Sequence, residues 1–419
     1  MQMKNILFIL PWLPYPLKSG GHQAIFNGIK AVVNDYNVFI TYSENETEDN
    51  SLMQQELIKE FGGHINIIPY KKQQNREKKS FALRSYIAFG NLIEKTKRKL
   101  GLTNERFSPS FFQIALTDDK RILFLNDIIK QHNIDIVQCE MISCISYVLA
   151  LPANVKKIYV QHQIDYVRCQ LDLKEKGLLD SFKQKLAQSK KNEIFLLNHF
   201  DAIIALSEYD RDLMQKDGVS ATINVSPAIV STQFQPYTNY KKEKILSFIG
   251  SSKHLPNVTG IQWFIEKCWP KLKKKDKDYK LQIIGEWDDT TRKIIQKKHS
   301  EILFCGFVAN LNEILKNTIM IVPINSGSGI RMKILEAVSL SIPVVSTVIG
   351  AQGLPLENGV DCFISDDADT FVENILKFKD NKLQEQMVHN AQEKIKRTYS
   401  FTSLKKSRLN IYSNLFILS

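Results

Sequence analysis

The sequence predicts an α/β protein built from two doubly wound parallel sheets. Short runs of apolar and β-branched residues recur along the chain, and longer amphipathic stretches separate them. The runs are apolar throughout, which is typical of parallel strands covered by helices on both faces. Their alternation with helical stretches indicates βαβ units. The pattern pauses at the polar residues 234–244 (FQPYTNYKKEK), so we expect a linker there between two halves of comparable size.

The first half, residues 1–233, is expected to hold six buried strands. Its opening run resembles a signal peptide in length, but Pro11 and Pro14 interrupt it and no small-residue cleavage site follows. We therefore interpret this run as the first strand of the domain. The expected strands cover residues 5–10, 38–42, 65–69, 134–138, 157–161 and 202–206.

The second half, residues 245–399, repeats the pattern with five expected strands. These cover residues 245–249, 281–284, 302–305, 319–322 and 344–346. The last stretch, residues 400–419, is amphipathic, and we expect a helix there that packs back on the first domain.

The composition is typical of a folded intracellular protein. The 419 residues are 43% hydrophobic and 24% charged, which excludes a disordered tail and a disulfide-stapled mini-protein. No run reaches the ~18 apolar residues that a membrane-spanning helix needs. The six cysteines form no CxxC pair and no Cys/His metal spacing, so we expect buried thiols in a reducing cytoplasm, without disulfides or structural zinc.

The net charge of +12 favours an anionic partner. Residues 71–100 hold ten lysines and arginines but two acidic residues, with aromatic and aliphatic residues between them. This pattern is typical of contact with an anionic membrane face or another polyanion, and the solvated charged face of an ordinary helix is an equally good explanation. Nucleic acid is not expected as a partner, because no recognised nucleic-acid-binding module is evident.

The sharpest local signal lies in residues 323–353 (PINSGSGIRMKILEAVSLSIPVVSTVIGAQG). A buried strand is followed by the small-residue loop Ser326-Gly327-Ser328-Gly329, and then by a helical pattern that ends before Pro343. A glycine loop that leads into a helix lets backbone N–H groups approach an anion, and the helix dipole favours negative charge there. The segment therefore predicts an anion site.

Charge placement on this helix agrees with an anion site. Arg331 and Lys333 fall in or near the first turn, where a cation costs about 0.3–1 kcal/mol without a ligand and a bound diphosphate reverses the sign. Glu336 lies three residues after Lys333 and shares its side of the helix, where its carboxylate can accept hydrogen bonds from a ribose diol. The alternative is an ordinary exposed turn with a Lys333–Glu336 surface pair.

The segment resembles the signature region of retaining glycosyltransferases of the GT-B fold and the family-4 type. Within that family it is similar to bacterial members with a GSGIRxKILEA loop followed by PVVST. Further motifs occur in the family's order: PWLPYPLKSGGHQ (11–23), DAIIALSEYDRDLM (201–214), SFIGSSKHLPNVTGIQWFIEKCWP (247–270), LQIIGE (281–286) and FCGFVANLNEIL (304–315). The resemblance covers nearly the whole chain, and it implies two Rossmann-like domains that face a cleft.

The resemblance also implies roles for individual residues. His162 matches the family histidine that approaches the donor sugar, Lys333 would hold the diphosphate, and Glu336 would bind the nucleotide ribose, so these three are the catalytic candidates. Gly20 and His22 are candidates for the acceptor side. The donor-binding candidates are Gly21, Lys253, Gly327, Ser328, Gly329, Ile330, Arg331 and Gly350.

Three positions depart from the family pattern. Ser328 stands where the first acid of the family's E-x7-E motif is expected, so a carboxylate contact to the donor sugar is lost or replaced. Ser251 stands in place of the usual arginine after the glycine that opens the second domain. Ala228-Ile229 replaces the asparagine-glycine pair often seen at the domain crossing. These changes bear on donor identity more than on fold.

The implied reaction is transfer of a sugar, with retention, from a nucleotide-sugar to a glycan or lipid-linked glycan in bacterial surface polysaccharide synthesis. It would take place in the cytoplasm, at the inner face of the membrane if residues 71–100 bind there. A same-face reaction is expected, in which a donor phosphate oxygen helps to deprotonate the acceptor. No metal or other cofactor is expected, because Lys, Arg and the helix terminus would carry the phosphate charge. Two alternatives remain: a degenerate GT-B protein that binds nucleotide or scaffolds polysaccharide assembly without transfer, and a sugar-nucleotide epimerase, which the motifs resemble less.

Overall fold

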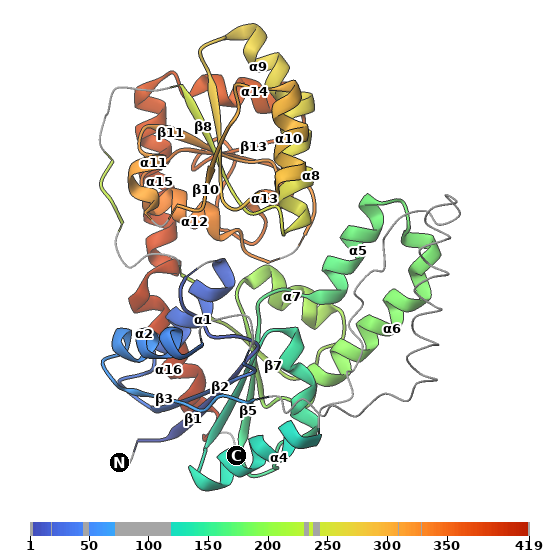
Figure 1. The fold of residues 1–419 in the computed structure, drawn as a ribbon, viewed down its shortest axis with the longest axis vertical. Helices are drawn as coiled ribbons and strands as arrows, with labels where there is room; N and C mark the ends of the chain where they lie inside the picture. The colour runs from blue at the N-terminus through green and yellow to red at the C-terminus, as the bar shows by residue number, and fades with distance from the viewer. Residues whose placement is uncertain are drawn as a thin grey trace.

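The structure, a computed structural model, describes residues 3–17, 19–44, 50–71, 119–229, 234–237, 244–308, 310–327 and 329–417. The chain forms two α/β domains stacked along the long axis of the molecule (Figure 1). Each domain is a parallel sheet with helices around it, so the predicted fold class is confirmed. The expected basic segment, residues 71–100, lies outside the described residues apart from Lys71.

The first domain contains a seven-stranded parallel sheet in the order β3-β2-β1-β4-β5-β6-β7. Its strands are β1 (Asn5–Leu10), β2 (Asn37–Tyr42), β3 (Ile65–Ile67), β4 (Ile136–Glu140), β5 (Lys156–Gln161), β6 (Ala202–Ala205) and β7 (Thr222–Val225). The described helices are α1 (Gly20–Lys30), α2 (Asn50–Glu60), α4 (Asp119–Gln131), η1 (Ile142–Ala150), α5 (Asp165–Glu175), α6 (Leu179–Leu197) and α7 (Glu208–Lys216). The strands β1 and β4 to β6 are almost wholly buried, as expected from their apolar sequences.

The second domain contains a six-stranded parallel sheet in the order β10-β9-β8-β11-β12-β13. Its strands are β8 (Ile245–Ile249), β9 (Lys280–Ile284), β10 (Leu303–Gly306), β11 (Thr318–Val322), β12 (Val344–Ser346) and β13 (Phe363–Ile364). Its helices are α8 (Leu255–Trp263), η2 (Phe264–Cys268), α9 (Trp269–Lys275), α10 (Asp289–Lys298), α11 (Leu311–Leu315), α12 (Met332–Ser339), α13 (Val348–Ala351), α14 (Ala368–Lys377) and α15 (Asn381–Tyr399).

The two sheets present their carboxyl ends to each other. In each sheet the strand order reverses direction near its centre, between β1 and β4 and between β8 and β11, and ligands of open α/β sheets bind beside such switch points. The loops that follow these strands meet between the domains. A Cβ on Gly20 of α1 would lie 2.7 Å from the Met332 side chain, and a Cβ on Gly329 would lie 2.8 Å from the backbone oxygen of His162.

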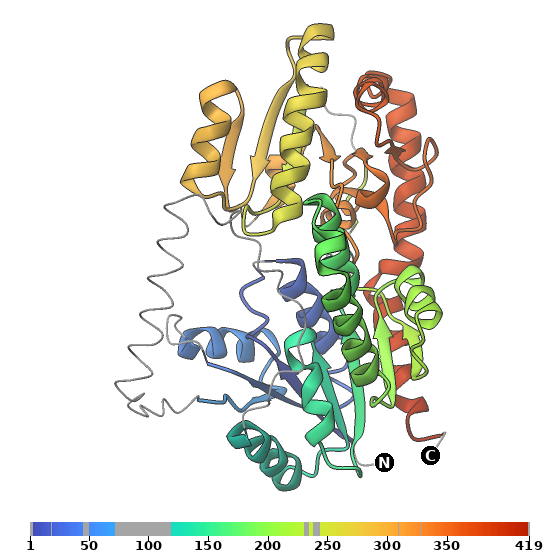
Figure 2. The same ribbon diagram turned by 90° about the vertical axis from the view of Figure 1, so that its right-hand side faces the viewer.

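The last helix, α16 (Phe401–Asn414), returns to the first domain. Figure 2 shows α15 and α16 along one side of the molecule, from the second domain down to the first. The Tyr412 hydroxyl donates a hydrogen bond to Gln138 of β4, and the Tyr412 ring meets the Tyr36 ring edge-on at 5.4 Å. The end of the chain is therefore part of the first domain's core.

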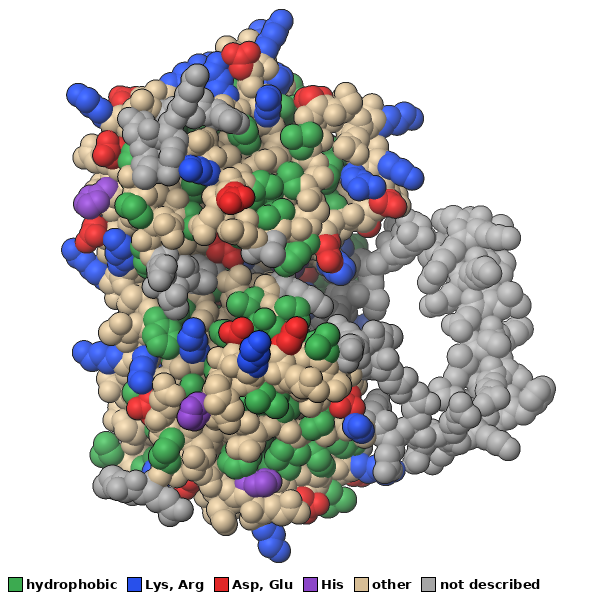
Figure 3. Space-filling view, turned by 60° about the vertical axis from the view of Figure 1, so that its left-hand side comes forward, with side chains coloured by type: hydrophobic (Ala, Val, Ile, Leu, Met, Phe, Trp, Pro, Cys, Tyr) green, Lys and Arg blue, Asp and Glu red, His purple; other side chains and the backbone are tan. Residues whose placement is uncertain are grey.

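Three further observations concern the sequence expectations. No helix within the described ranges is long and apolar enough to cross a membrane. None of the six cysteines, all of which the structure describes, forms a disulfide. On the face drawn in Figure 3, lysine and arginine side chains are scattered over both domains with acidic side chains among them.

Candidate active site

The start of α12 lies at the interface between the domains, and its N-cap residue, Arg331, makes no side-chain cap. Other described helices are capped by a serine, threonine or aspartate, as α7 is by Ser207 and α14 by Asp367, whereas α5 and α6, like α12, are not capped by their N-cap residue. The four N–H groups at the start of a helix need such partners. The preceding loop turns through positive φ at Gly327 and Gly329, which only glycine adopts without strain. The local structure therefore fits an anion at this helix end.

A second helix start lies beside it. The N-cap residue of α8, His254, also makes no side-chain cap. The two helices are held together by close contacts: Asn257 of α8 accepts a hydrogen bond from Lys333 Nζ at 2.8 Å, and a Cβ on Gly327 would lie 3.3 Å from Pro256. Two positive helix ends thus converge on one place in the second domain.

The cations at this place are held in an unfavourable environment. Burial, followed by the positive charge of Arg331, lowers the pKa of Lys333 to about 7, although Glu336 acts in the opposite direction. The Lys333 ammonium also lies 4.4 Å from the centre of the Phe248 ring. Burial lowers the pKa of Arg331 to about 10, and Asp210 of α7 opposes this shift across the interface. Such a site gains free energy when an anion binds.

Glu336 makes a hydrogen bond between the domains. Its Oε1 accepts from Nε2 of Gln23, on α1, at 2.9 Å. Burial raises the pKa of the Glu336 carboxyl group, while the hydrogen bond from Gln23 and the charge of Lys333 lower it. A ribose diol that binds Glu336 must therefore share this carboxylate with Gln23 or displace it.

His162 follows β5, and its backbone contacts Gly329 in the glycine loop that precedes α12 of the second domain. The imidazole Nε2 lies 2.5 Å from Oε2 of Glu140, the last residue of β4. The side chains of His162 and Glu140 are 9% and 2% exposed, respectively. This hydrogen bond uses Nε2 and leaves Nδ1 for a ligand.

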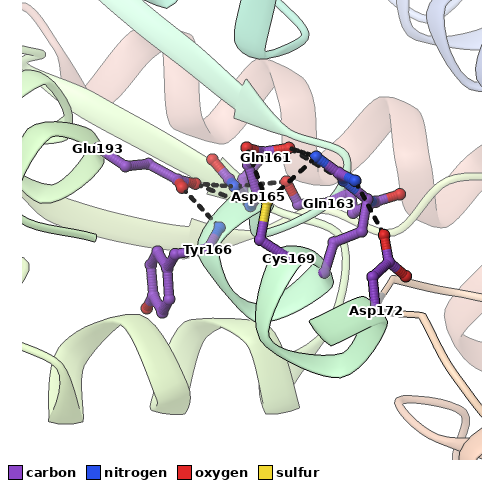
Figure 4. A network of polar contacts seen from close by, with 8 residues as sticks. Gln161, Gln163, Asp165, Tyr166, Cys169, Asp172 and Glu193 are labelled. Atoms are coloured by element: carbon purple, nitrogen blue, oxygen red, sulfur yellow. Dashed lines mark hydrogen bonds and ion pairs between the residues drawn. The ribbon is translucent and has the colours of Figure 1, made fainter. Parts of the chain in front are cut away.

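The loop that carries His162 is held by a second buried carboxylate (Figure 4). Glu193 of α6 accepts hydrogen bonds from the backbone N–H groups of Asp165 and Tyr166, the first two residues of α5, at 3.1 and 3.0 Å. It also accepts one from Gln161 Nε2, which donates in addition to the Gln163 carbonyl. Burial raises the pKa of Glu193 to about 7, and the backbone donors act against that shift. Glu193 therefore caps α5 and fixes both ends of the His162 loop.

His22, one of the two acceptor-side candidates, lines a cavity of about 370 Å³ at the carboxyl ends of β1 and β2, whereas Gly20 faces Met332 of the second domain. Ser19 caps α1, and its hydroxyl lies 2.7 Å from Nδ1 of His22, which lines the cavity. The indole N–H of Trp12 is buried without a hydrogen-bond partner among the described residues. The other lining side chains of interest are aromatic or uncharged and polar: Tyr15, Tyr42, Ser43 and Asn50.

Gly21 lies between this cavity and the end of β4, the strand that carries Glu140. A Cβ on Gly21 would lie 2.9 Å from the Met141 side chain and 3.9 Å from the Trp12 ring. Met141 directly follows Glu140 in the chain, so Gly21 lies between Trp12, which lines the cavity, and the residue next to Glu140. A larger cavity of about 490 Å³ is lined by residues at the amino ends of the second sheet's strands, including Lys244 and Pro343, and does not border this site.

The remaining candidates have different environments. Lys253 is exposed and pairs with Glu286 at 2.9 Å. Ile330 is partly buried, and its side chain would lie 3.9 Å from a Cβ on Gly353. Gly350 has no room for a side chain, because its Cβ would overlap the Ser346 hydroxyl and lie 2.7 Å from the Val322 carbonyl oxygen. Ser328 lies outside the described residues.

Sequence reasoning missed three residues that the structure brings to this site. Glu140, Gln23 and Glu193 each act through partners that are distant in the sequence. Glu140 carried a usable signal, because an acidic residue at the carboxyl end of a buried central strand points toward the sites of such sheets. Gln23 ends the 11–23 motif, but nothing in that motif marked it as a partner of Glu336, and Glu193 occupies an ordinary helix position without a signal.

Comparisons with known proteins agree with this geometry. Residues 243–381 match the family described as "Glycosyl transferases group 1". A curated relative, the "Uncharacterized 44.6 kDa protein in cps region" of Klebsiella pneumoniae, is 29% identical over 144 residues. That match covers 32% of this chain and 37% of the relative's length.

Solved structures match over the full length at low identity. TarM of S. aureus, solved as a mutant in complex with Fondaparinux, alpha-GlcNAc-glycerol and UDP, is 16% identical, with a TM-score of 0.68 over 99% of this chain and 100% of its own. HepE of Anabaena, solved with UDP and glucose, is 14% identical, with a TM-score of 0.66 over 98% and 100% of the two chains. Sucrose-phosphate synthase of Thermosynechococcus elongatus is 13% identical, with a TM-score of 0.69 over 99% and 100%. The chain has the GT-B fold, and residues 243–381 in its second domain match the glycosyl transferases group 1 family.

Proposed function

We propose that this GT-B protein is a retaining glycosyltransferase that moves a sugar from a nucleotide-sugar to a glycan or lipid-linked glycan in bacterial surface polysaccharide synthesis. One observation carries the proposal. Two helix N-termini without side-chain caps converge on Lys333 and Arg331, whose pKa values are both lowered by burial. A diphosphate supplies the negative charge that this place lacks, and Glu336 on the next turn suits a ribose diol.

The donor side of the proposal follows from charge. As the bond between sugar and diphosphate breaks, negative charge develops on the leaving phosphate, and fixed cations and helix dipoles stabilise it. Lys333 and Arg331 would carry that role without a metal. UDP is the natural first probe, because TarM and HepE were solved with UDP.

The proposed mechanism keeps the sugar on one face. The leaving phosphate oxygen accepts the proton of the acceptor hydroxyl, while His162 Nδ1 contacts the sugar and fixes its position. Positioning of this kind contributes through reduced freedom of the reactants rather than through covalent chemistry. The contact between Gly329 and the His162 backbone supports this arrangement, because it brings the glycine loop before α12, the proposed diphosphate site, next to the histidine.

The proposed acceptor site is the cavity beside Trp12. Its aromatic side chains offer flat apolar faces, and its uncharged polar groups suit sugar hydroxyls. None of the described residues that line it is a lysine, arginine, aspartate or glutamate. The end of the acceptor that enters is therefore proposed to be an uncharged sugar rather than a phosphate.

A second candidate function is nucleotide binding without transfer. It is favoured by Ser328, which stands where the family's first motif acid is expected, and by the Gln23 hydrogen bond that occupies Glu336. Release of free sugar from a nucleotide-sugar without acceptor separates the two functions, because a binding protein would show none.

The first experiment is a thermal-shift panel of nucleoside diphosphates and their sugar conjugates. A true donor at one hundred times its Kd is expected to stabilise the protein by about 2.7 kcal/mol. Lys333→Ala and Glu336→Ala should then abolish transfer without unfolding the protein. Lys271→Ala is the matched control, since Lys271 is a surface cation paired with Asp369. Full activity in either site variant contradicts the site assignment.

The proposed location is the cytoplasm, in agreement with six cysteines that form no disulfide. Contact of residues 71–100 with an anionic membrane face is proposed on sequence charge alone. Sedimentation with vesicles tests it: binding to phosphatidylglycerol-containing vesicles at low salt, lost at high salt, supports the contact. Equal binding to neutral vesicles contradicts it.

A further inference from the structure

A continuous chain of buried polar groups runs from the candidate site to the last helix. His162 Nε2 is hydrogen-bonded to Glu140 Oε2, and Glu140 Oε1 accepts from Gln138 Nε2 at 2.6 Å. Gln138 Oε1 in turn accepts from the Tyr412 hydroxyl. Gln138 and Tyr412 are 0% exposed, and Glu140 is 2% exposed. Water therefore has no access to the middle of this chain.

The direction of each hydrogen bond is fixed from the Tyr412 end. Burial raises the pKa of Tyr412, so its hydroxyl keeps its proton and donates. The Gln138 amide must then present its oxygen to Tyr412 and its NH₂ group to Glu140. Glu140 Oε1 accepts from Gln138, and with Glu140 as a carboxylate its Oε2 accepts from His162. Nε2 of His162 must carry a proton for the chain to close.

We propose that Glu140 is a positioning residue for His162, and that it keeps the proton on Nε2 and the ring in one orientation so that Nδ1 is the nitrogen offered to the substrate. The proposal rests on the proposed function for its effect on turnover, but the proton position can be observed without any substrate. It also makes α16 part of the site, because Tyr412 sets the orientation of Gln138.

A purely structural role for the pair explains less. The attraction between two buried charged or polar groups is largely offset by the loss of their hydration, so such a pair is a weak source of stability. A histidine, in contrast, has two distinct nitrogens, and the hydrogen bond made by one sets the state of the other. Gly329, in the glycine loop before α12, contacts the His162 backbone, so the protonation of this ring bears directly on the proposed donor site.

The deciding experiment is NMR of the full chain with ¹⁵N-labelled imidazole rings. The chain has eight histidines, and the spectrum of His162→Gln identifies the signal of interest. In the neutral ring of wild-type His162 the proton is expected on Nε2. In Glu140→Gln the amide can either donate or accept, so the proton should divide between Nε2 and Nδ1. An unchanged pattern in Glu140→Gln, or a proton on Nδ1 alone in the wild type, overturns the proposal.

Two tyrosine variants extend the test. Tyr412→Phe removes the donor that orients Gln138, and a partial shift of the proton toward Nδ1 is expected. Tyr36→Phe is the matched control, because its ring packs edge-on against Tyr412 while its hydroxyl is outside the chain of hydrogen bonds. If Glu140→Gln fails to fold, Tyr412→Phe decides alone: no shift relative to Tyr36→Phe counts against the proposal.

The kinetic arm uses hydrolysis of UDP-glucose without acceptor. Glu140→Gln is expected to lower kcat at least about tenfold, because loss of the partner that orients a functional histidine typically costs about 10- to 100-fold or more, and to leave KM within about twofold. Tyr36→Phe should leave both unchanged. If the wild type releases no glucose, the proposed function is wrong for this donor, while the proton position still decides the role of Glu140. If Glu140→Gln lowers both kcat and the melting temperature while the proton stays on Nε2, Glu140 has a role in the fold alone.

Discussion

The charge of Lys333 gives the sharpest test of the proposed donor site. Its pKa in the unliganded protein is about 7, lowered first by burial and then by Arg331. The negative charge of a diphosphate beside the ammonium group opposes both effects and should return the pKa toward the ordinary value of about 10.4. At a pH between these two values, the protein must take up a proton when it binds the ligand.

The size of the effect follows from the two pKa values. At pH 8 a group with a pKa of about 7 is about one-tenth protonated, so binding should take up about 0.9 proton per UDP. The protonated fraction of free Lys333 falls from about one-half at pH 7 to about one-hundredth at pH 9. UDP should therefore bind about 50-fold more weakly at pH 9 than at pH 7, which is about 2 kcal/mol.

Isothermal titration calorimetry of UDP at pH 8, in two buffers with different ionisation enthalpies, measures this uptake directly. The terminal phosphate is fully ionised there, since its pKa is about 6. Arg331, with a pKa of about 10, stays protonated. Lys333→Arg should bind UDP without proton uptake, because arginine does not lose its charge. Binding by the wild type with no uptake, or the same uptake in Lys333→Arg, would refute the reasoning.

Three further changes test other parts of the site. Gly329→Ala should lower transfer at least tenfold, because its Cβ would lie 2.8 Å from the His162 backbone oxygen. Gly359→Ala, which has a similar positive φ and nothing within 4 Å, should show only the backbone strain of about 1–2 kcal/mol in a urea titration and keep its activity. His162→Ala should lower kcat while UDP binding by calorimetry stays unchanged; weaker UDP binding would argue for a diphosphate contact instead. The pKa of Glu193 is raised to about 7 in the folded protein. The free energy of unfolding should therefore fall by about 3 kcal/mol as the pH rises from about 4.5 to 7. A Glu193→Gln variant whose free energy of unfolding falls equally over this range would contradict this.

The fold followed from the sequence because its signals are local. Eleven apolar runs were predicted as strands, and each overlaps a strand of the two parallel sheets. The strand β4 lies two residues later than predicted, which moves Glu140 into the strand. Two strands were missed, β7 and β13. The strand β7 is at the sheet edge and mostly only partly buried, and β13 has two residues, so neither forms an apolar run.

The site was only partly predictable because its pairings are not local. The Gly327–Gly329 turn and the cations of α12 lie within one segment, so residue type and spacing were enough to mark it. The hydrogen bond between Gln23 and Glu336 joins residues 313 positions apart, and that between Gln138 and Tyr412 joins residues 274 apart. Pairings of this kind depend on how two domains and a returning helix meet, which no local pattern encodes.

The contacts between the domains use the residues proposed to bind the donor. Gln23 is hydrogen-bonded to Glu336, Asp210 faces the charge of Arg331, and Gly329 touches the backbone of His162. The lowered pKa values show that burying the charges of Lys333 and Arg331 costs free energy, which a bound diphosphate offsets. A diphosphate on these two cations therefore stabilises the domain arrangement in which Gly329 contacts the His162 backbone. We infer that binding energy from the nucleotide, which does not react, is available to hold the sugar against His162, where it contributes to catalysis rather than to affinity alone.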